Sequence, residues 1–195
     1  MYAIDFISDF SVDPIAEPDT TLAQLLQQTA KHNTTLTLTT SKRGLMNQVP
    51  KEAIAETLAT VKQHPRLLPV GILDPRHYLG WQDDLRTCVE GGCVAIRMAP
   101  GPQSWSPNTL IFRKMVEAVG KAPTQTPLPL IVDFNGAGKE AMEWIHVIGE
   151  ITHGAGVPVV LNEVSYGYLG ELITVMQEYP NVYAAIRWLS LADGL

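Results

Sequence analysis

Three acidic residues stand where short apolar runs of the chain end, namely Asp9, Asp133 and Glu163. If those runs are parallel strands, the three carboxylates stand at carboxyl ends that share one rim. Oxygen ligands suit hard divalent cations, so the set would hold one ion and activate a water molecule on it. Without a metal, repulsion would keep one carboxyl protonated and create a general acid–base pair. The alternative is that these carboxylates cap turns or pair with Arg97 or Arg187.

Three further residues are predicted to contact a substrate. Arg97 ends the fourth apolar run, where a guanidinium would clamp a substrate carboxylate through two hydrogen bonds. A salt bridge to Asp133 or Glu163 is the alternative, and the two roles are compatible. Trp105 lies in the long proline-rich loop after Arg97 and would form an apolar wall. His77 is the histidine nearest the predicted rim, although an ordinary loop position is favoured over a ligand role for it. Asp133 and Glu163 are the predicted catalytic residues.

Seven short apolar runs give the chain its periodicity, and each is separated from the next by an amphipathic stretch. Such alternation predicts βαβ units and a parallel sheet, and nearly all-apolar runs suit strands covered on both faces. The runs are residues 3–6, 35–38, 67–73, 94–98, 128–134, 157–161 and 182–189.

The number of repeats predicts an α/β fold of the TIM-barrel type. A complete eight-unit barrel typically needs about 250 residues, whereas this chain has 195. We therefore expect one incomplete barrel domain over residues 1–195, with seven parallel strands and the eighth unit missing. A truncated chain, a partner covering the open edge and a closed seven-stranded barrel would each explain the gap. An open doubly wound sheet is the structural alternative.

Apolar side chains at helical spacing predict the intervening helices. Thr20 or Thr21 would cap the first helix, Pro50 would open the second, and Gly91 would end the third. Trp144 and Trp188 are interpreted as packing residues. The apolar stripes fall within residues 22–29, 54–61, 85–89, 112–119, 142–148 and 169–176.

Composition narrows the classes of partner and location. The net charge is −6 and no basic cluster occurs, so we expect no nucleic-acid partner. No apolar stretch approaches the roughly 20 residues that span a bilayer, and the amino terminus enters a strand at once, so we expect a cytoplasmic protein with no membrane association. Cys88 and Cys93 are predicted to be reduced packing residues, with a disulfide across the Gly-Gly turn between them as the alternative.

Several segments of the chain resemble the amidohydrolase-related family of metal-dependent hydrolases and decarboxylases. The resemblance implies a (β/α) barrel with its site at the carboxyl ends of the strands. The segments that carry it are HPRLLPVGILDP at 64–75, VAIRMAP at 94–100 with WS at 105–106, YPNVYA at 179–184 and LSLADGL at 189–195.

The family's metal ligands are changed in this sequence. Members usually open with Asp-x-His-x-His, and here Asp5 is followed by Ile7 and Asp9 at the histidine positions. The fifth and sixth strands usually supply histidines, and these read Val-Asp-Phe-Asn and Leu-Asn-Glu-Val. The aspartate of the eighth strand has no counterpart. The metal site is therefore degenerate, and the cofactor expected is one divalent cation, Mn²⁺, Mg²⁺ or Zn²⁺, or none.

Two functions follow from the resemblance and the residues together. The first is hydrolysis or decarboxylation of a small carboxylate-bearing molecule, with Arg97 binding substrate and Asp133 or Glu163 acting as base. The second is a catalytically inactive relative that serves as a binding or interaction module. A fragment that needs its missing unit for activity is a third interpretation. The expected partners are a small-molecule substrate and, at the open barrel edge, a second copy or another protein.

Overall fold

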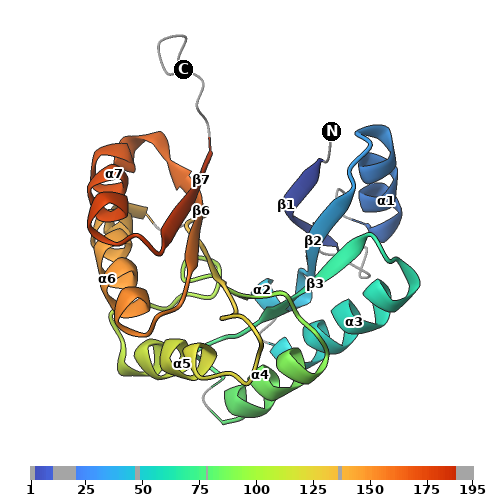
Figure 1. The fold of residues 1–195 in the computed structure, drawn as a ribbon, viewed down its shortest axis with the longest axis horizontal. Coiled ribbons are helices and arrows are strands. Elements are labelled where there is room, and N and C mark those ends of the chain that lie inside the picture. Colours follow the sequence, from blue (N-terminus) through green and yellow to red (C-terminus); the bar gives the residue numbers. More distant parts are fainter. Residues whose placement is uncertain (1–2, 11–20, 47–48, 78, 136–137, 188–195) are drawn as a thin grey trace. The chain divides into compact units, whose positions relative to one another are not determined.

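The structure, a computed structural model, describes residues 3–10, 21–46, 49–77, 79–135 and 138–187 (Figure 1). Strands and helices alternate along the chain, and the strand order in the sheet is β1-β2-β3-β4-β5-β6-β7. The α/β class and the seven parallel strands of a TIM-barrel type fold are confirmed. Trp188 lies outside the described residues, as does the side chain of Arg187.

Two compact units make up the chain, residues 1–96 and residues 97–195. The first contains β1, α1, β2, α2, α3, β3 and α4, and β4 lies across the boundary. The bounds are β1 (Ile4–Phe10), α1 (Leu22–Lys31), β2 (Leu36–Ser41), α2 (Arg43–Met46), α3 (Pro50–Gln63), β3 (Leu67–Ile72), α4 (Trp81–Glu90) and β4 (Ala95–Met98).

The second unit continues the alternation and adds two single turns of 3-10 helix. The bounds are α5 (Leu110–Gly120), β5 (Leu130–Asp133), η1 (Gly138–Glu140), α6 (Ala141–Gly154), β6 (Val159–Ser165), η2 (Tyr166–Tyr168), α7 (Leu169–Glu178) and β7 (Val182–Arg187).

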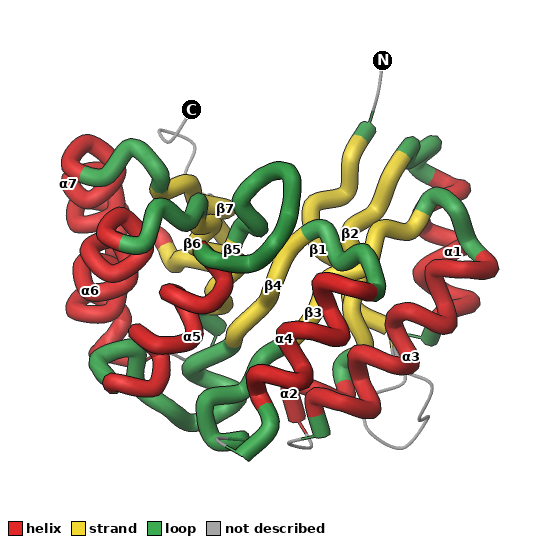
Figure 2. Tube along the Cα trace, turned by 60° about the horizontal axis from the view of Figure 1, so that its bottom comes forward, coloured by secondary structure: helices red, strands yellow, loops and turns green. Residues whose placement is uncertain are grey.

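In the first unit, β2 pairs in parallel with β1 on one side and with β3 on the other. The helices α1, α3 and α4 pack along these strands (Figure 2). Phe10, Leu25 and Leu67 form a buried cluster between β1, α1 and β3. Burial of each such side chain contributes roughly 1.5–3 kcal/mol, so this apolar contact holds the first helix to its strands.

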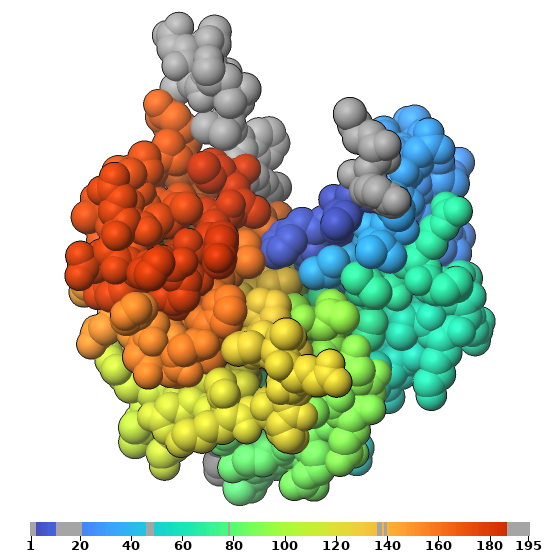
Figure 3. Space-filling view, viewed as in Figure 1, coloured from blue at the N-terminus to red at the C-terminus, as the bar shows by residue number. Residues whose placement is uncertain are grey.

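In the second unit, β6 pairs in parallel with β5 and β7. Helices α6 and α7 pack against one another, and their atoms form a continuous surface in the space-filling view (Figure 3). Ile145 and Ile148 of α6 are fully buried, as are Phe112 and Met115 of α5. One buried stripe on each helix is what a helix lying on a sheet requires.

The helix ends follow local chemistry that the sequence makes visible. Thr21 caps α1, since its hydroxyl accepts from the amide of Gln24 while the Gln24 side chain accepts from the Thr21 amide. Pro50 is the first residue of α3, and α4 ends directly before Gly91. These three predictions are confirmed, and Trp144 is buried as expected.

Several expectations about bounds and faces are wrong. The strand β1 runs to Phe10, so Asp9 lies within the strand rather than after it. Ile173 and Met176 of α7 are exposed, and the buried residues of that helix are Leu172 and Val175. Met142 of α6 is also exposed. A helix needs only part of an apolar stripe to cover its strand, so spacing alone overestimates the buried face.

Burial also differs along the sheet. Every residue of β4 and β5 is buried, as expected for strands covered on both faces. β1 and β7 stand first and last in the strand order, and they expose Ile4, Tyr183 and Ile186. Full coverage is therefore confirmed for the middle strands and wrong for the terminal ones.

Gly71 in β3 provides a first test of the packing. A β-carbon at this position would lie 2.3 Å from Cys88 Sγ and 2.9 Å from Cys88 Cβ, so the glycine lets α4 approach the strand. We expect Gly71→Ala to lower the free energy of unfolding by roughly 1–3 kcal/mol through overpacking, measured by urea denaturation.

Gly154 is the matched control for that substitution, because nothing lies within 4 Å of its added β-carbon. Gly154→Ala should leave stability unchanged or raise it slightly through helix propensity. Equal effects of the two substitutions would contradict the close approach at Gly71.

Candidate functional site

The centre of the candidate site is an ion pair between Arg97 on β4 and Asp133 on β5. Asp133 Oδ2 accepts from both Nε and an Nη of Arg97, each at 2.6 Å. The two side chains are about 95% removed from solvent, with side-chain exposures of 7% and 4%. The salt bridge that was one of two predicted roles of Arg97 is therefore confirmed.

Asn162 on β6 completes this network. Its side-chain amide donates to Asp133 Oδ1 at 2.7 Å. The register explains the contact, because Asp133 and Asn162 are directly paired residues of neighbouring parallel strands. Both oxygens of the Asp133 carboxylate thus accept hydrogen bonds, one oxygen from a cation and the other from an amide.

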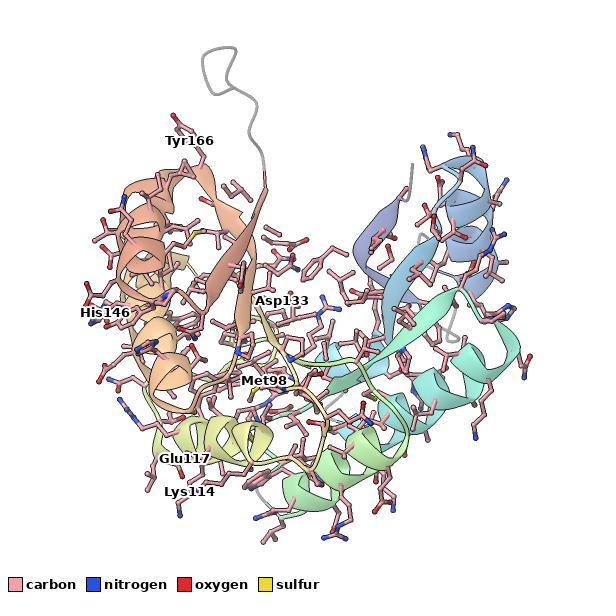
Figure 4. The ribbon with its side chains drawn as sticks, viewed as in Figure 1. Met98, Lys114, Glu117, Asp133, His146 and Tyr166 are labelled. Atoms are coloured by element: carbon pink, nitrogen blue, oxygen red, sulfur yellow. The ribbon has the colours of Figure 1, made fainter. Side chains whose placement is uncertain are left out.

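The network lies on three consecutive strands, at the carboxyl ends of β4 and β5 and in the middle of β6. Arg97 is the third of four residues in β4, and Asp133 is the last residue of β5. Figure 4 shows Asp133 on the inner side of its unit, whereas Lys114 and Glu117 of α5 and His146 of α6 lie on the outer, helix-bearing side. Consecutive strand ends are where barrel enzymes place their chemistry.

Glu163 lies in β6 directly after Asn162 and has an unusual backbone conformation. Its φ is +58°, in the left-handed region that a glutamate rarely adopts. The pairing of β6 with β7 shifts between Asn162 and Val164, so Glu163 is the extra residue of a β-bulge. Bulges re-aim a side chain out of the strand's alternation, and they are frequent beside functional sites. Glu163 is half-buried.

The loop after β4 is ordered by a buried amide. Gln103 is fully buried, and its side-chain oxygen accepts from the Ala99 amide and from Trp105 Nε1, both at 2.9 Å. The Trp105 ring packs against Phe112 of α5, with centroids 5.4 Å apart. Trp105 therefore has a fixed position in this loop, while its predicted contact with a substrate stays a prediction.

Sequence reasoning missed two members of this site. The place of Asn162 in the site could have been predicted, since it follows an apolar run, stands next to Glu163 and aligns with Asp133 in parallel register. The role of Gln103 could not have been predicted, because a glutamine in a proline-rich loop gives no indication of burial.

The other predicted residues belong to the first unit. His77 follows β3, and its Nδ1 lies 3.2 Å from Asp84 Oδ2 in the first turn of α4. Trp81 begins α4 and is buried. Asp9 lies in β1, and its part in a site with Asp133 and Glu163 stays a prediction.

A divalent cation fits poorly at Asp133. A guanidinium and an amide already donate to its two oxygens, and the adjacent positive charge would repel an ion. Within the ranges that the structure describes, no three His, Cys, Asp or Glu side chains gather as a metal-binding group. We therefore derive no chemical step through a metal.

The cysteines are free thiols and both are buried. Their reduced state is confirmed, and the disulfide alternative is wrong for this structure. A hydrogen bond to Cys93, followed by burial, raises the pKa of the Cys88 thiol. A thiol held in its neutral form is a poor nucleophile, so Cys88 acts as a packing residue.

Comparisons with known proteins support the fold. An uncharacterised TIM-barrel protein of Bordetella bronchiseptica superposes with a TM-score of 0.69 at 14% identity, over 94% of this chain and 74% of that one. A lyase/mutase candidate protein of Burkholderia cenocepacia superposes with a TM-score of 0.61 at 11% identity, over 98% of this chain and 69% of that one.

Sequence comparisons add no family. The chain matches no protein-family model, and it matches no curated protein. The barrel fold is thus supported, while the amidohydrolase-related resemblance remains a hypothesis. Among the described helices, none has the length and apolar character needed to cross a membrane.

The buried ion pair can be tested by a double-mutant cycle. Asp133→Leu removes the carboxylate that pairs with the buried Arg97 guanidinium, and we expect a loss of roughly 3–5 kcal/mol in unfolding free energy. Combining it with Arg97→Met should cost less than Asp133→Leu alone, since the buried positive charge is then removed as well. Urea denaturation measures both.

Glu52→Gln is the control for this cycle, because Glu52 pairs with Arg43 in a largely exposed position. It should cost at most about 1 kcal/mol. Strict additivity of the two core substitutions would contradict direct coupling of Arg97 and Asp133.

Asp84 predicts a pH dependence of stability. Burial raises its pKa above the ordinary 3.8, and the hydrogen bond and charge of His77 oppose that shift. The folded state binds the Asp84 proton more tightly than the unfolded state does. The resulting contribution to folding stability is therefore complete below the pKa of Asp84 in the unfolded chain, and it is lost as pH rises through the pKa in the folded protein. Asp84→Asn should therefore raise the melting temperature at neutral pH, and the gain should shrink in acid.

Thermal melts across acid and neutral pH measure this gain. Asp83→Asn is the matched control, since Asp83 is exposed in the same helical turn. It should change stability by no more than about 0.5 kcal/mol. A loss of stability for Asp84→Asn at neutral pH would show that the bond to His77 outweighs the burial cost.

Proposed function

We propose that this chain is an enzyme of the TIM-barrel type that acts on a small carboxylate-bearing molecule, in the manner of amidohydrolase-related hydrolases and decarboxylases. One observation carries the proposal. Arg97 is a buried guanidinium whose plane is held by Asp133 and, through Asp133, by Asn162. A pre-oriented guanidinium at strand ends is suited to bind a planar carboxylate with little loss of entropy.

The residues then take distinct roles. Arg97 binds the substrate carboxylate, and Asp133 orients Arg97 instead of acting as base, since both its oxygens already accept hydrogen bonds. Glu163 is the general base, and the bulge aims its carboxylate out of the strand. It accepts a proton from the water that attacks the substrate carbonyl in hydrolysis. Trp105, in the same unit as Arg97, is proposed to contact the substrate. The substrate contact that the sequence predicts for His77, which lies in the first unit, stays a prediction.

A catalytically inactive binding module is the second candidate. Two observations favour it: Ile7 and Asp9 replace the family's imidazole ligands, and Asp133 is engaged by Arg97. Such a module would bind the same carboxylates without converting them. Calorimetric titration with Mn²⁺, Mg²⁺ and Zn²⁺ tests the divalent cation that the sequence led us to expect.

The binding step is tested with a panel of small carboxylates and their amides. Malonate, succinate and phthalate should raise the melting temperature of the wild-type protein, while malonamide should not. Arg97→Lys keeps the charge and loses the planar fork, so the shift should disappear. Circular dichroism confirms that the variant is folded.

Arg86→Lys is the matched control, because Arg86 is an exposed arginine in an ion pair with Asp83. It should keep the full shift. A carboxylate shift that survives in Arg97→Lys would overturn the proposed binding role.

Turnover separates the enzyme from the binding module. Esters, lactones and carboxylic acids that share the bound carboxylate are assayed for acid release and for carbon dioxide release. Glu163→Gln should lower the rate by about 10²–10⁴-fold with binding unchanged. Binding without conversion of any such compound would favour the module.

A further inference from the structure

His77 and Asp84 form a second polar pair, within the first unit. His77 Nδ1 and Asp84 Oδ2 are 3.2 Å apart. Backbone bonds fix both ends, since the His77 amide donates to the Asp74 carbonyl and the Asp84 amide donates to the Gly80 carbonyl. The pair thus joins the turn after β3 to the first turn of α4.

Burial is uneven across this pair. The Asp84 side chain is 6% exposed, whereas that of His77 is 42% exposed. An ionised carboxylate can only accept, so Nδ1 of His77 carries the proton and Nε2 is the basic nitrogen. A buried acid that orients a solvent-accessible imidazole is the arrangement by which enzymes prepare a histidine for proton transfer.

Several ionisable groups surround the His77–Asp84 pair. Lys51 of α3 and Asp83 of α4 act electrostatically on Asp84, and Asp84 in turn acts electrostatically on Cys88, one turn later in the same helix. Asp83 and Asp84 both lie in the first turn of α4, where the helix dipole stabilises negative charge.

Arg76 precedes His77 and is itself held in place. Its Nε and Nη2 donate to the two oxygens of Asp74 at 2.6 to 3.1 Å. The Asp74 side chain is fully buried, and that of Arg76 is 25% exposed. A guanidinium anchored on one side by a buried carboxylate is suited to bind an anion on the other.

We propose that His77 and Asp84 form a proton-transfer dyad at the carboxyl end of β3, with Arg76 binding the anionic group of a small ester. In the step, Nε2 of His77 accepts a proton from a water molecule as its oxygen bonds to the ester carbonyl carbon. The carbon–oxygen bond to the alcohol then breaks, and the imidazolium returns the proton to the leaving alcohol. One water is consumed, and one acid and one alcohol form.

Asp84 is a positioning residue in this scheme, because it acts through His77. The inference does not rest on the role of Arg97, which belongs to the second unit. It assigns His77 proton transfer where the sequence predicted a substrate contact.

Nitrogen-15 NMR tests the tautomer. In the wild-type protein, neutral His77 should carry its proton on Nδ1, and Asp84→Asn should redistribute it between the two nitrogens. His153 is the internal control, since its Nδ1 faces the neutral amide oxygen of Asn181 at 3.1 Å. Its spectrum should not change in Asp84→Asn. A proton on Nε2 of His77 in the wild-type protein would overturn the dyad.

Esterolysis tests the chemistry, with p-nitrophenyl acetate as the neutral probe and mono-p-nitrophenyl glutarate as the anionic one. His77→Gln should lower the protein-dependent rate by at least about tenfold, and His153→Gln should not. The acid limb of the pH–rate profile should follow the protonation of His77 seen by NMR. Asp84→Asn should lower kcat and alter that limb.

Arg76→Lys separates anion binding from proton transfer. It should raise KM for the anionic ester several-fold and leave the neutral ester unaffected. Equal rates for wild type and His77→Gln, or equal effects of Arg76→Lys on both esters, would overturn the corresponding part of the proposal. Neither result bears on carboxylate binding at Arg97.

Discussion

The ion pair between Arg97 and Asp133 is the constraint on which the second unit's site depends. Two charges removed from water are favourable only if their remaining hydrogen-bonding capacity is also met. Asn162 meets part of it, because its amide occupies the second carboxylate oxygen. The contact requires Asp133 and Asn162 to be directly paired, so the register of β5 with β6 and the polar network support one another.

The bulge at Glu163 is a consequence of the same demand. Asn162 must face Asp133 across the β5–β6 register, and Val164 must be buried in the core. In a regular strand Asn162 and Val164, which are two residues apart, would lie on the same face. One extra residue in the left-handed conformation lets β6 resume its pairing with β7 after Asn162 and leaves Glu163 out of the alternation. The backbone strain therefore sits beside the ion pair, where a functional side chain would be expected.

Much of the fold was predictable because it rests on local rules. The capping box at Thr21, Pro50 at a helix start and the fully buried runs at β4 and β5 are readable from residue types alone. The site was only partly predictable. Arg97, Asp133 and Glu163 were visible as polar residues ending apolar runs, and a salt bridge of Arg97 to Asp133 was one of the two roles predicted for the arginine. The partners Asn162, Gln103 and Asp84 depend on register and burial, which no single position in the sequence records.

The Arg97–Asp133 and His77–Asp84 pairs differ in what they can do, because only the imidazole can exchange a proton. Arg97 keeps its charge at any ordinary pH, so Asp133 can orient the guanidinium but cannot exchange a proton through it. The His77 imidazole can accept and return a proton and remains open to solvent on one side, so Asp84 can support proton transfer through it. A guanidinium pair therefore serves binding and an imidazole pair serves chemistry. At 11–14% identity to solved structures the fold is shared while function depends on such side chains, and these pairs are where the function of this chain has to be tested.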